Sequence, residues 1–206
     1  MIYFILEFQK MQRKESFGEK KLSFIDRIIY KMRCGKIINN LDFQNKIVAD
    51  TGCGYNYMFL QSIKDKIKMW YAVDLSLKES DNDKIKTIIS DLNEGMLLPD
   101  DSLDIVTSMA IIEHLSNPDQ YIKECFRILK KWWFMIITTP SPLAKPVLEF
   151  MTYKLWLWSK EEIQDHKKYY DKRSLLTILS NNWFLLKNTK HKYFQFWMNN
   201  IVIVKK

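Results

Sequence analysis

The stretch that decides the fold is Val48-Ala49-Asp50-Thr51-Gly52-Cys53-Gly54-Tyr55-Asn56, in which a buried run ends in an acid and meets two glycines. The apolar run from Lys46 to Asp50 predicts a buried strand, and the residues from Tyr57 to Lys64 predict a helix. Glycines at such a turn let the backbone approach a ligand closely, and the helix that follows offers free N–H groups. This stretch therefore predicts a ligand-binding turn, although a G-x-G pair alone is weak evidence.

Two further acids strengthen this prediction. Met69 to Asp74 predicts a second strand that ends in an acid, and Ile85 to Ser90 predicts a third, which is followed by Asp91. In dinucleotide-binding folds, an acid roughly 20 residues beyond the glycine turn binds the ribose hydroxyls, and Asp74 follows at close to that spacing. A carboxylate can accept two hydrogen bonds from a diol, which suits Asp74 for a ribose. Asp91 could accept a hydrogen bond from an adenine amino group.

Strands and helices alternate along the rest of the chain, which predicts a mostly parallel sheet covered on both faces. The last two predicted strands are too close together for a helical crossover, so a hairpin with one antiparallel strand fits them better. The expected helices are Leu22 to Leu41, Asn117 to Leu129 and Ser174 to Ser180, and the expected strands are Leu103 to Met109, Phe134 to Thr139, Trp183 to Lys187 and Ile201 to Val204.

Size and composition predict one soluble globular domain. The chain has 206 residues, with 47% hydrophobic and 27% charged residues, and we expect one domain over 1–206. Within it we expect an N-terminal helical segment over 1–45 and a lid over 143–173. The three cysteines form no disulfide framework, and no apolar run approaches the roughly 18 residues that a membrane span needs. These features predict a cytoplasmic protein.

The charge and the metal-ligand residues exclude some partners. The formal net charge is +8, but the lysines are scattered and form no long run, so we expect a solvated basic surface and no nucleic acid partner. The three histidines and three cysteines show no metal-ligand spacing, so no metal is expected.

The order of the motifs resembles that of class I S-adenosylmethionine-dependent methyltransferases, in particular the small-molecule branch called type 11. The resemblance implies a Rossmann-like, seven-stranded, mostly parallel sheet with helices on both faces and one antiparallel strand near the edge. It rests on residues 48–56, 71–74 and 90–92, on residues 98–106, on Glu113-His114-Leu115, on residues 124–130 and on Asp165-His166-Lys167-Lys168-Tyr169-Tyr170.

The resemblance also implies roles for individual residues. His114 becomes the candidate general base, because the family places this segment near the transferred methyl group, and histidine can take a proton near neutral pH. The alternative for His114 is a structural histidine beside the fourth strand. His166 and Tyr169 would shape the acceptor pocket or anchor the lid. The residues implied to bind S-adenosylmethionine are Asp50, Gly52, Cys53, Gly54, Asp74, Leu75, Asp91, Leu92, Met109 and Ala110.

The sequence departs from the family pattern at several turns. Asn56 stands at the usual third glycine, and Lys130-Lys131-Trp132-Trp133 stand where Lys-Pro-Gly-Gly is common. Trp183 stands in a triplet whose middle residue is commonly glycine. If the turns require a left-handed backbone, each tryptophan costs about 1–3 kcal/mol.

The predicted function is methyl transfer from S-adenosylmethionine to a small-molecule or glycan-like acceptor by in-line displacement. One alternative is a methyltransferase-like protein that binds the cofactor with weak or no catalysis. A nicotinamide-dependent oxidoreductase is disfavoured, because Tyr57 stands at the third glycine of G-x-G-x-x-G. An RNA methylase is disfavoured because Met109-Ala110-Ile111-Ile112 stands where an Asn-Pro-Pro-Tyr type motif would be.

Overall fold

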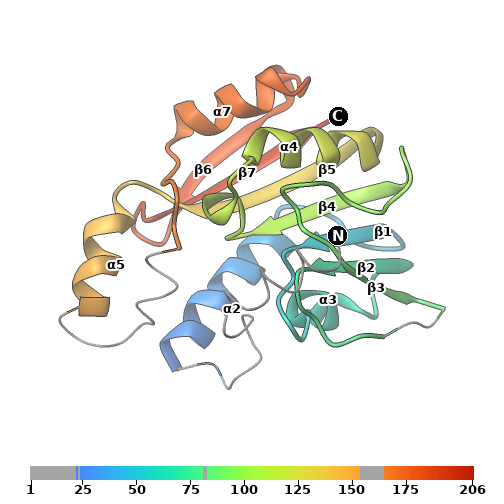
Figure 1. Cartoon of the computed structure of the whole chain (residues 1–206), viewed down its shortest axis with the longest axis horizontal. Helices are drawn as coiled ribbons and strands as arrows, with labels where there is room; N and C mark the ends of the chain where they lie inside the picture. Colours follow the sequence, from blue (N-terminus) through green and yellow to red (C-terminus); the bar gives the residue numbers. More distant parts are fainter. Residues whose placement is uncertain (1–21, 23, 81–82, 154–164) are drawn as a thin grey trace.

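The computed structural model describes residues 22, 24–80, 83–153 and 165–206, and shows one sheet between two layers of helices (Figure 1). The strands are β1 (Ile47–Thr51), β2 (Met69–Asp74), β3 (Ile85–Ile89), β4 (Leu103–Met109), β5 (Leu129–Pro140), β6 (Lys190–Phe194) and β7 (Asn199–Lys205). The helices are α2 (Phe24–Ile38), α3 (Met58–Ile63), α4 (Pro118–Ile128), α5 (Ala144–Tyr153) and α7 (Lys172–Asn181), with 3-10 turns η1 (Ile112–His114) and η2 (Leu186–Asn188).

Among the described residues the sheet has seven strands, in the order β3-β2-β1-β4-β5-β7-β6. The first five in that order pair in parallel, β7 is antiparallel to β5, and β6 is antiparallel to β7. The predicted fold class is therefore confirmed. Because β2 and β4 flank β1 on opposite sides, the winding of the chain reverses beside β1. In open α/β sheets, ligands bind at such a switch point, outside the carboxyl ends of the strands.

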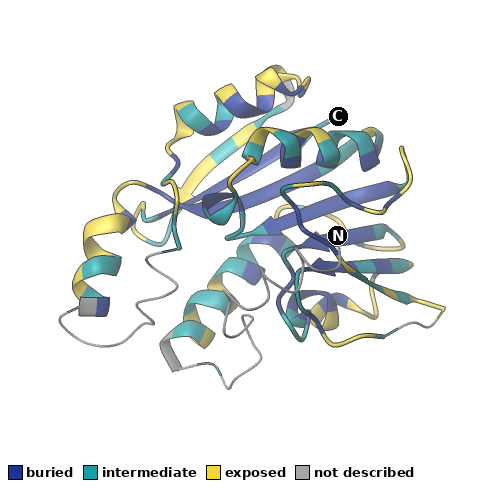
Figure 2. Ribbon diagram, viewed as in Figure 1, coloured by how far each residue is buried: buried dark blue, intermediate teal, exposed yellow. Residues whose placement is uncertain are grey.

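Successive residues of the strands face two separate cores. Ala49, Val73 and Val106 face one core together with α4 and α7. Val48 and Ile105 face the other core together with residues of α2 and α3. Side chains alternate between the faces of a strand, so a central strand covered on both sides must be apolar throughout. Figure 2 shows the central strands buried and the outward surfaces of the helices exposed.

Most predicted elements are confirmed, with changes at their ends. The strands predicted for Met69 to Asp74 and Leu103 to Met109 have the observed bounds. The strand from Phe134 to Thr139 is part of the longer β5. The N-terminal helix is confirmed as α2, while residues 1–21 of the expected N-terminal segment and residues 154–164 of the expected lid lie outside the described residues. Within the described part of the chain, no helix is both long and apolar enough to cross a membrane.

The strand predicted for Trp183 to Lys187 is wrong. Phe184 is buried, whereas Trp183 and Leu185 are exposed, and the chain forms η2 there before the edge strand β6 begins at Lys190. The apolar residues in this stretch suggested a strand, but they lie in the turn that follows α7 and at the start of η2. The edge strand itself is Lys-His-Lys-Tyr-Phe, which is too polar for the pattern of a buried strand to reveal.

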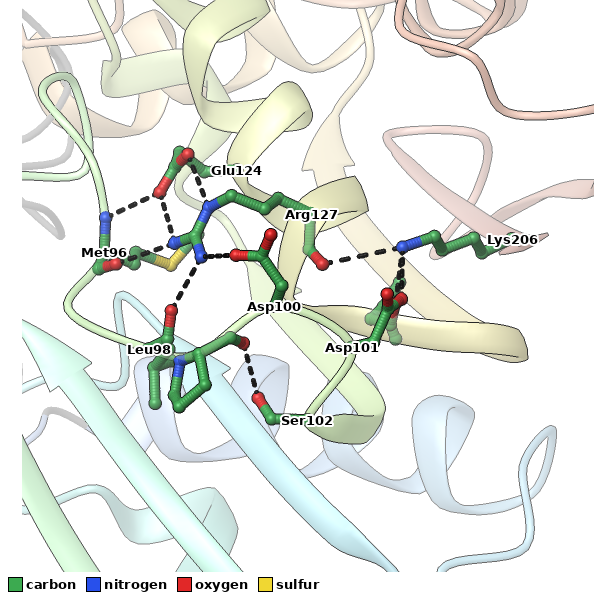
Figure 3. A network of polar contacts seen from close by, with 10 residues as sticks. Met96, Leu98, Asp100, Asp101, Ser102, Glu124, Arg127 and Lys206 are labelled. Atoms are coloured by element: carbon green, nitrogen blue, oxygen red, sulfur yellow. Dashed lines mark hydrogen bonds and ion pairs between the residues drawn. The ribbon is translucent and has the colours of Figure 1, made fainter.

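Arg127 fixes the loop between β3 and β4 onto α4 (Figure 3). Its guanidinium donates to both carboxylate oxygens of Glu124 at 3.0 and 2.8 Å. It also donates to the backbone carbonyls of Met96 at 2.9 Å and Leu98 at 2.8 Å, and to Asp100 at 2.6 Å. Glu124 in turn accepts from the Met96 backbone N–H at 3.0 Å. Arg127 and Glu124, both in the segment that resembles the family, therefore hold a loop.

Candidate active site at the carboxyl ends of β1, β2 and β4

The glycine turn after β1 is tied to the end of β2. The backbone N–H groups of Gly52 and Cys53 donate to the carbonyl of Val73 at 2.7 and 3.2 Å. Gly52 has a φ of 73° and Gly54 a φ of 71°, in the left-handed region that favours glycine. A Cβ on Gly52 would lie 1.9 Å from Cγ1 of Ile111. Gly52 is therefore required by the packing of Ile111, and close approach of a cofactor to it remains a prediction.

Asp74 closes β2 and holds the same turn. Its carboxylate is buried, and its Oδ2 accepts from the Gly54 backbone N–H at 2.8 Å. Its Oδ1 lies 3.5 Å from the backbone N–H of Ser76. A carboxylate at the end of β2 and the glycine turn at the end of β1 are thus in direct contact. Their binding of an adenosyl group remains a prediction.

Asp50 places a second carboxylate inside the end of β1. It is fully buried, and its Oδ1 accepts from the Thr107 hydroxyl of β4 at 2.6 Å. The pKa of Asp50 is raised to about 7, chiefly by burial; the Thr107 hydrogen bond opposes this rise and the negative charge of Asp74 adds to it. Its Oδ2 has no hydrogen-bond partner among the described residues. A buried carboxyl group with one oxygen that lacks a hydrogen-bond partner suits a ligand that brings a cation or an N–H donor.

Asp91 organises the loop after β3. Its Oδ1 accepts from the backbone N–H and the side-chain amide of Asn93, at 2.9 and 2.8 Å. The Oδ1 of Asn93 accepts from the backbone N–H groups of Ser116 and Asn117, at 2.7 and 3.0 Å. Asp91 thereby couples this loop to the start of α4. Its contact with an adenine remains a prediction.

The other predicted cofactor residues differ in exposure. Leu92 and Cys53 are buried in the two hydrophobic cores. Leu75, Met109 and Ala110 are half-buried at the ends of β2 and β4, and Ala110 has a positive φ of 54°. A surface depression of about 550 Å³ lies beside α3 and is lined by Asn56, Tyr57, Met58, Gln61, Ser62 and Lys78. None of the predicted cofactor residues lines it, so it is not the site that the strand ends define.

The predicted catalytic and lid residues form one cluster. Nδ1 of His114 is hydrogen-bonded to Oδ2 of Asp165 at 2.9 Å, and Nδ1 of His166 to the Tyr169 hydroxyl at 3.0 Å. The two histidine rings meet edge to face with centroids 4.7 Å apart. Burial, and to a smaller extent the neighbouring His114, lowers the pKa of His166 to about 4. The structure thus brings together His114, His166 and Tyr169, and it adds Asp165 as the partner of His114.

Glu113 lies next to this cluster, with a carboxylate oxygen within 4.8 Å of a ring nitrogen of each histidine. It is fully buried, and its Oε2 accepts from the Thr139 hydroxyl of β5 at 2.9 Å. Burial raises its pKa. Its backbone carbonyl accepts from the Lys167 backbone N–H at 2.8 Å, which joins η1 to the segment that carries His166. In the sequence, Glu113 stands out only as an acid in an otherwise apolar stretch, and that signal does not reveal its distant partners.

Comparison with known proteins agrees with this architecture. Residues 49–136 match a family model described as a methyltransferase domain. A protein of Mycolicibacterium smegmatis described as an S-adenosylmethionine-dependent methyltransferase is 30% identical over 101 residues, which cover 47% of this chain and 39% of that relative. The chain therefore spans less than half the length of this curated relative.

Solved structures show the same fold at low sequence identity. A SAM-dependent methyltransferase from Archaeoglobus fulgidus superposes with a TM-score of 0.64 at 20% identity, covering 100% of both chains. A methyltransferase solved in complex with the Trm112 methyltransferase activator of Haloferax volcanii gives a TM-score of 0.69 at 13% identity, covering 87% of this chain and 92% of that chain.

Proposed function

We propose that this chain is a class I S-adenosylmethionine-dependent methyltransferase, as the matching methyltransferase-domain model and the S-adenosylmethionine-dependent relative support. It would transfer a methyl group from S-adenosylmethionine to a small-molecule or glycan-like acceptor. The cofactor would lie across the carboxyl ends of β1, β2 and β4. The observation that carries this proposal is the 2.8 Å hydrogen bond between the Asp74 carboxylate and the Gly54 N–H. It unites the acid suited to a ribose with the turn that begins the cofactor site.

The buried acids fit the polar ends of the cofactor. Asp74 would accept from the ribose hydroxyls, because a carboxylate can accept two hydrogen bonds from a diol. Asp50 would face the amino group of the methionine part, directly or through water, because its Oδ2 is buried with no partner among the described residues. Leu75, Asp91 and Leu92 would address the adenine, and Met109 and Ala110 would line the path to the acceptor.

S-adenosylmethionine supplies a methyl group that its sulfonium already activates. The protein has to align the acceptor, exclude water and remove a proton where the acceptor needs it. Nε2 of His114 is the group that would take this proton. Asp165 supports that role, because it occupies Nδ1 of the same ring and fixes its orientation.

Replacement of His114 tests the catalytic part of this proposal. His114→Ala should lower turnover by about 100-fold or more, the scale of a lost general base, and leave the affinity for S-adenosylmethionine nearly unchanged. Turnover would be followed as S-adenosylhomocysteine formed with a panel of hydroxyl and amine acceptors. Equal activity of the two proteins would remove His114 from the reaction. Binding of S-adenosylmethionine without turnover on any acceptor would favour a cofactor-binding protein with little or no catalysis.

A further inference from the structure

Three potential metal ligands from two distant parts of the chain meet beside the carboxyl end of β5, where Glu113 contacts Thr139. They are Glu113 and His114 of η1, and His166 from the segment that precedes α7. One ligand atom from each residue can be chosen so that all lie within 4.8 Å of one another. The sequence spacing gave no sign of this group, because His166 lies far along the chain from Glu113 and His114.

Each of the three side chains is held by a partner on one side. Thr139 donates to Oε2 of Glu113 at 2.9 Å, Asp165 pairs with Nδ1 of His114 at 2.9 Å, and the Tyr169 hydroxyl pairs with Nδ1 of His166 at 3.0 Å. These contacts leave Oε1 of Glu113 and Nε2 of both histidines as ligand atoms. Metal-bound histidines typically have their second ring nitrogen fixed by a carboxylate or another polar group in this way.

The Glu113 carboxylate provides a second, independent indication that this cluster binds a ligand. Oε1 of Glu113 is buried and has no hydrogen-bond partner among the described residues. A buried carboxylate oxygen without a partner is costly, and a cation removes that cost. The backbone hydrogen bond from Lys167 to the Glu113 carbonyl, at 2.8 Å, holds the two ligand-bearing segments together before any ion binds.

We propose that Glu113, His114 and His166 bind a divalent transition metal ion such as Zn²⁺ or Mn²⁺. Two imidazoles and one carboxylate suit such ions and leave coordination positions for water or for the acceptor. Glu113 and Asp165 bring two negative charges to the site. The guanidinium of Arg33 carries a positive charge that acts on both Glu113 and His166 and so opposes part of this negative charge.

The site also suggests what the ion does, and this part rests on the proposed methyl transfer. An acceptor hydroxyl bound to the ion would lose its proton to solvent more readily. A lone pair of the resulting oxyanion forms the new C–O bond with the methyl carbon. The electron pair of the C–S bond returns to sulfur, which leaves S-adenosylhomocysteine as the neutral thioether. With the ion bound, Nε2 of His114 would be a ligand atom, so the base role of His114 proposed above would apply only to the metal-free protein.

The test uses the full chain without a histidine tag, stripped with a chelator and then titrated with Co²⁺, whose visible spectrum reports nitrogen and oxygen ligands. Zn²⁺ competition then gives the affinity. We expect one ion per chain. Glu113→Gln and His166→Asn should each weaken binding by at least tenfold, and Asp165→Asn by about 10–100-fold, because it orients His114.

The third histidine of the chain supplies the matched control. His191 lies on β6 and pairs with Asn200 at 2.8 Å, so His191→Asn should bind the ion as the unaltered chain does. Circular dichroism in the presence of chelator would show that each variant is folded. Absence of stoichiometric binding to the unaltered chain would overturn the proposal. The proposal would also fail if Glu113→Gln and His166→Asn bound the ion as tightly as the unaltered chain does.

Calorimetry with S-adenosylmethionine on the metal-free chain separates this inference from the proposed function. Cofactor binding without ion binding would reject the metal site and leave the methyl-transfer proposal standing. Ion binding without cofactor binding would reject the methyl-transfer proposal and leave the metal site standing.

Discussion

Trp183 holds a backbone conformation that usually belongs to glycine. It follows α7 with a φ of 68°. Its N–H donates to the Ser180 carbonyl at 3.3 Å, and the next N–H, of Phe184, donates to the Leu179 carbonyl at 3.1 Å. This pattern is the Schellman motif, in which Trp183 occupies the position where glycine is enriched. The family's glycine at this point therefore has a purely geometric explanation.

Trp183→Gly should raise the free energy of unfolding by about 1 kcal/mol. Relief of the left-handed strain gives about 1–3 kcal/mol, and the greater entropy of glycine in the unfolded chain offsets about 0.5–1 kcal/mol of it. Urea unfolding would measure the difference. Trp183→Ala is the matched control, since it keeps the strain and loses the ring that lies 5.7 Å from Phe126. A stabilised alanine variant, or a destabilised glycine variant, would contradict this explanation.

Asp50 links pH to cofactor binding. Burial raises its pKa to about 7, so Asp50 is largely protonated below neutral pH and ionised above it. A cationic amino group prefers the ionised form. The affinity for S-adenosylmethionine should therefore increase as pH rises from about 6 to 7.5, and this increase should be absent from Asp50→Asn. Titration of the cofactor itself affects the unaltered chain and Asp50→Asn alike, so it cancels when the two are compared. If the affinity of both proteins changed with pH in the same way, the assigned role of Asp50 would be rejected.

At the scale of elements, Arg127 and Glu124 fasten the loop between β3 and β4 to α4. Arg127→Ala should lower the free energy of unfolding by about 2–3 kcal/mol, because it removes charged hydrogen bonds and leaves two carbonyls without their donor. Asp100→Ala should cost less than about 1 kcal/mol, since the Asp100 side chain is 73% exposed. Thermal and urea unfolding of both variants would show the order. Equal losses would mean that the surface ion pair, and not the contact with the loop backbone, provides the stability.

The elements that were predicted correctly are those with a strong local signal. β2 and β4 are buried between helices, so their sequences are apolar runs with clear ends. α4 begins with Asn117 as its N-cap and Pro118 in its first turn, both visible in the sequence. β6 was missed because an edge strand can be polar. The apolar residues that were taken for a strand lie instead in the turn after α7 and in η2.

At the scale of the whole molecule, the sheet brings separate motifs to one edge. Parallel pairing places Asp50, the glycine turn and Asp74 together, and this part of the site could be predicted because each acid closes its own strand. The cluster of Glu113, His114 and His166 could not be predicted from spacing. Its members meet only because the segment after residue 164 packs against η1, and that long-range contact has no local signature.

The measurement that tests the central claim most directly is calorimetric titration of S-adenosylmethionine into the chain and into Asp74→Ala. We predict that the unaltered chain binds one equivalent and that the variant binds more weakly by about 1–3 kcal/mol, the scale of lost charged hydrogen bonds. Asp100→Ala, which removes the same charge from an exposed position, should bind as the unaltered chain does. Unchanged affinity in Asp74→Ala, or no binding to the unaltered chain, would contradict a cofactor site at the ends of β1 and β2.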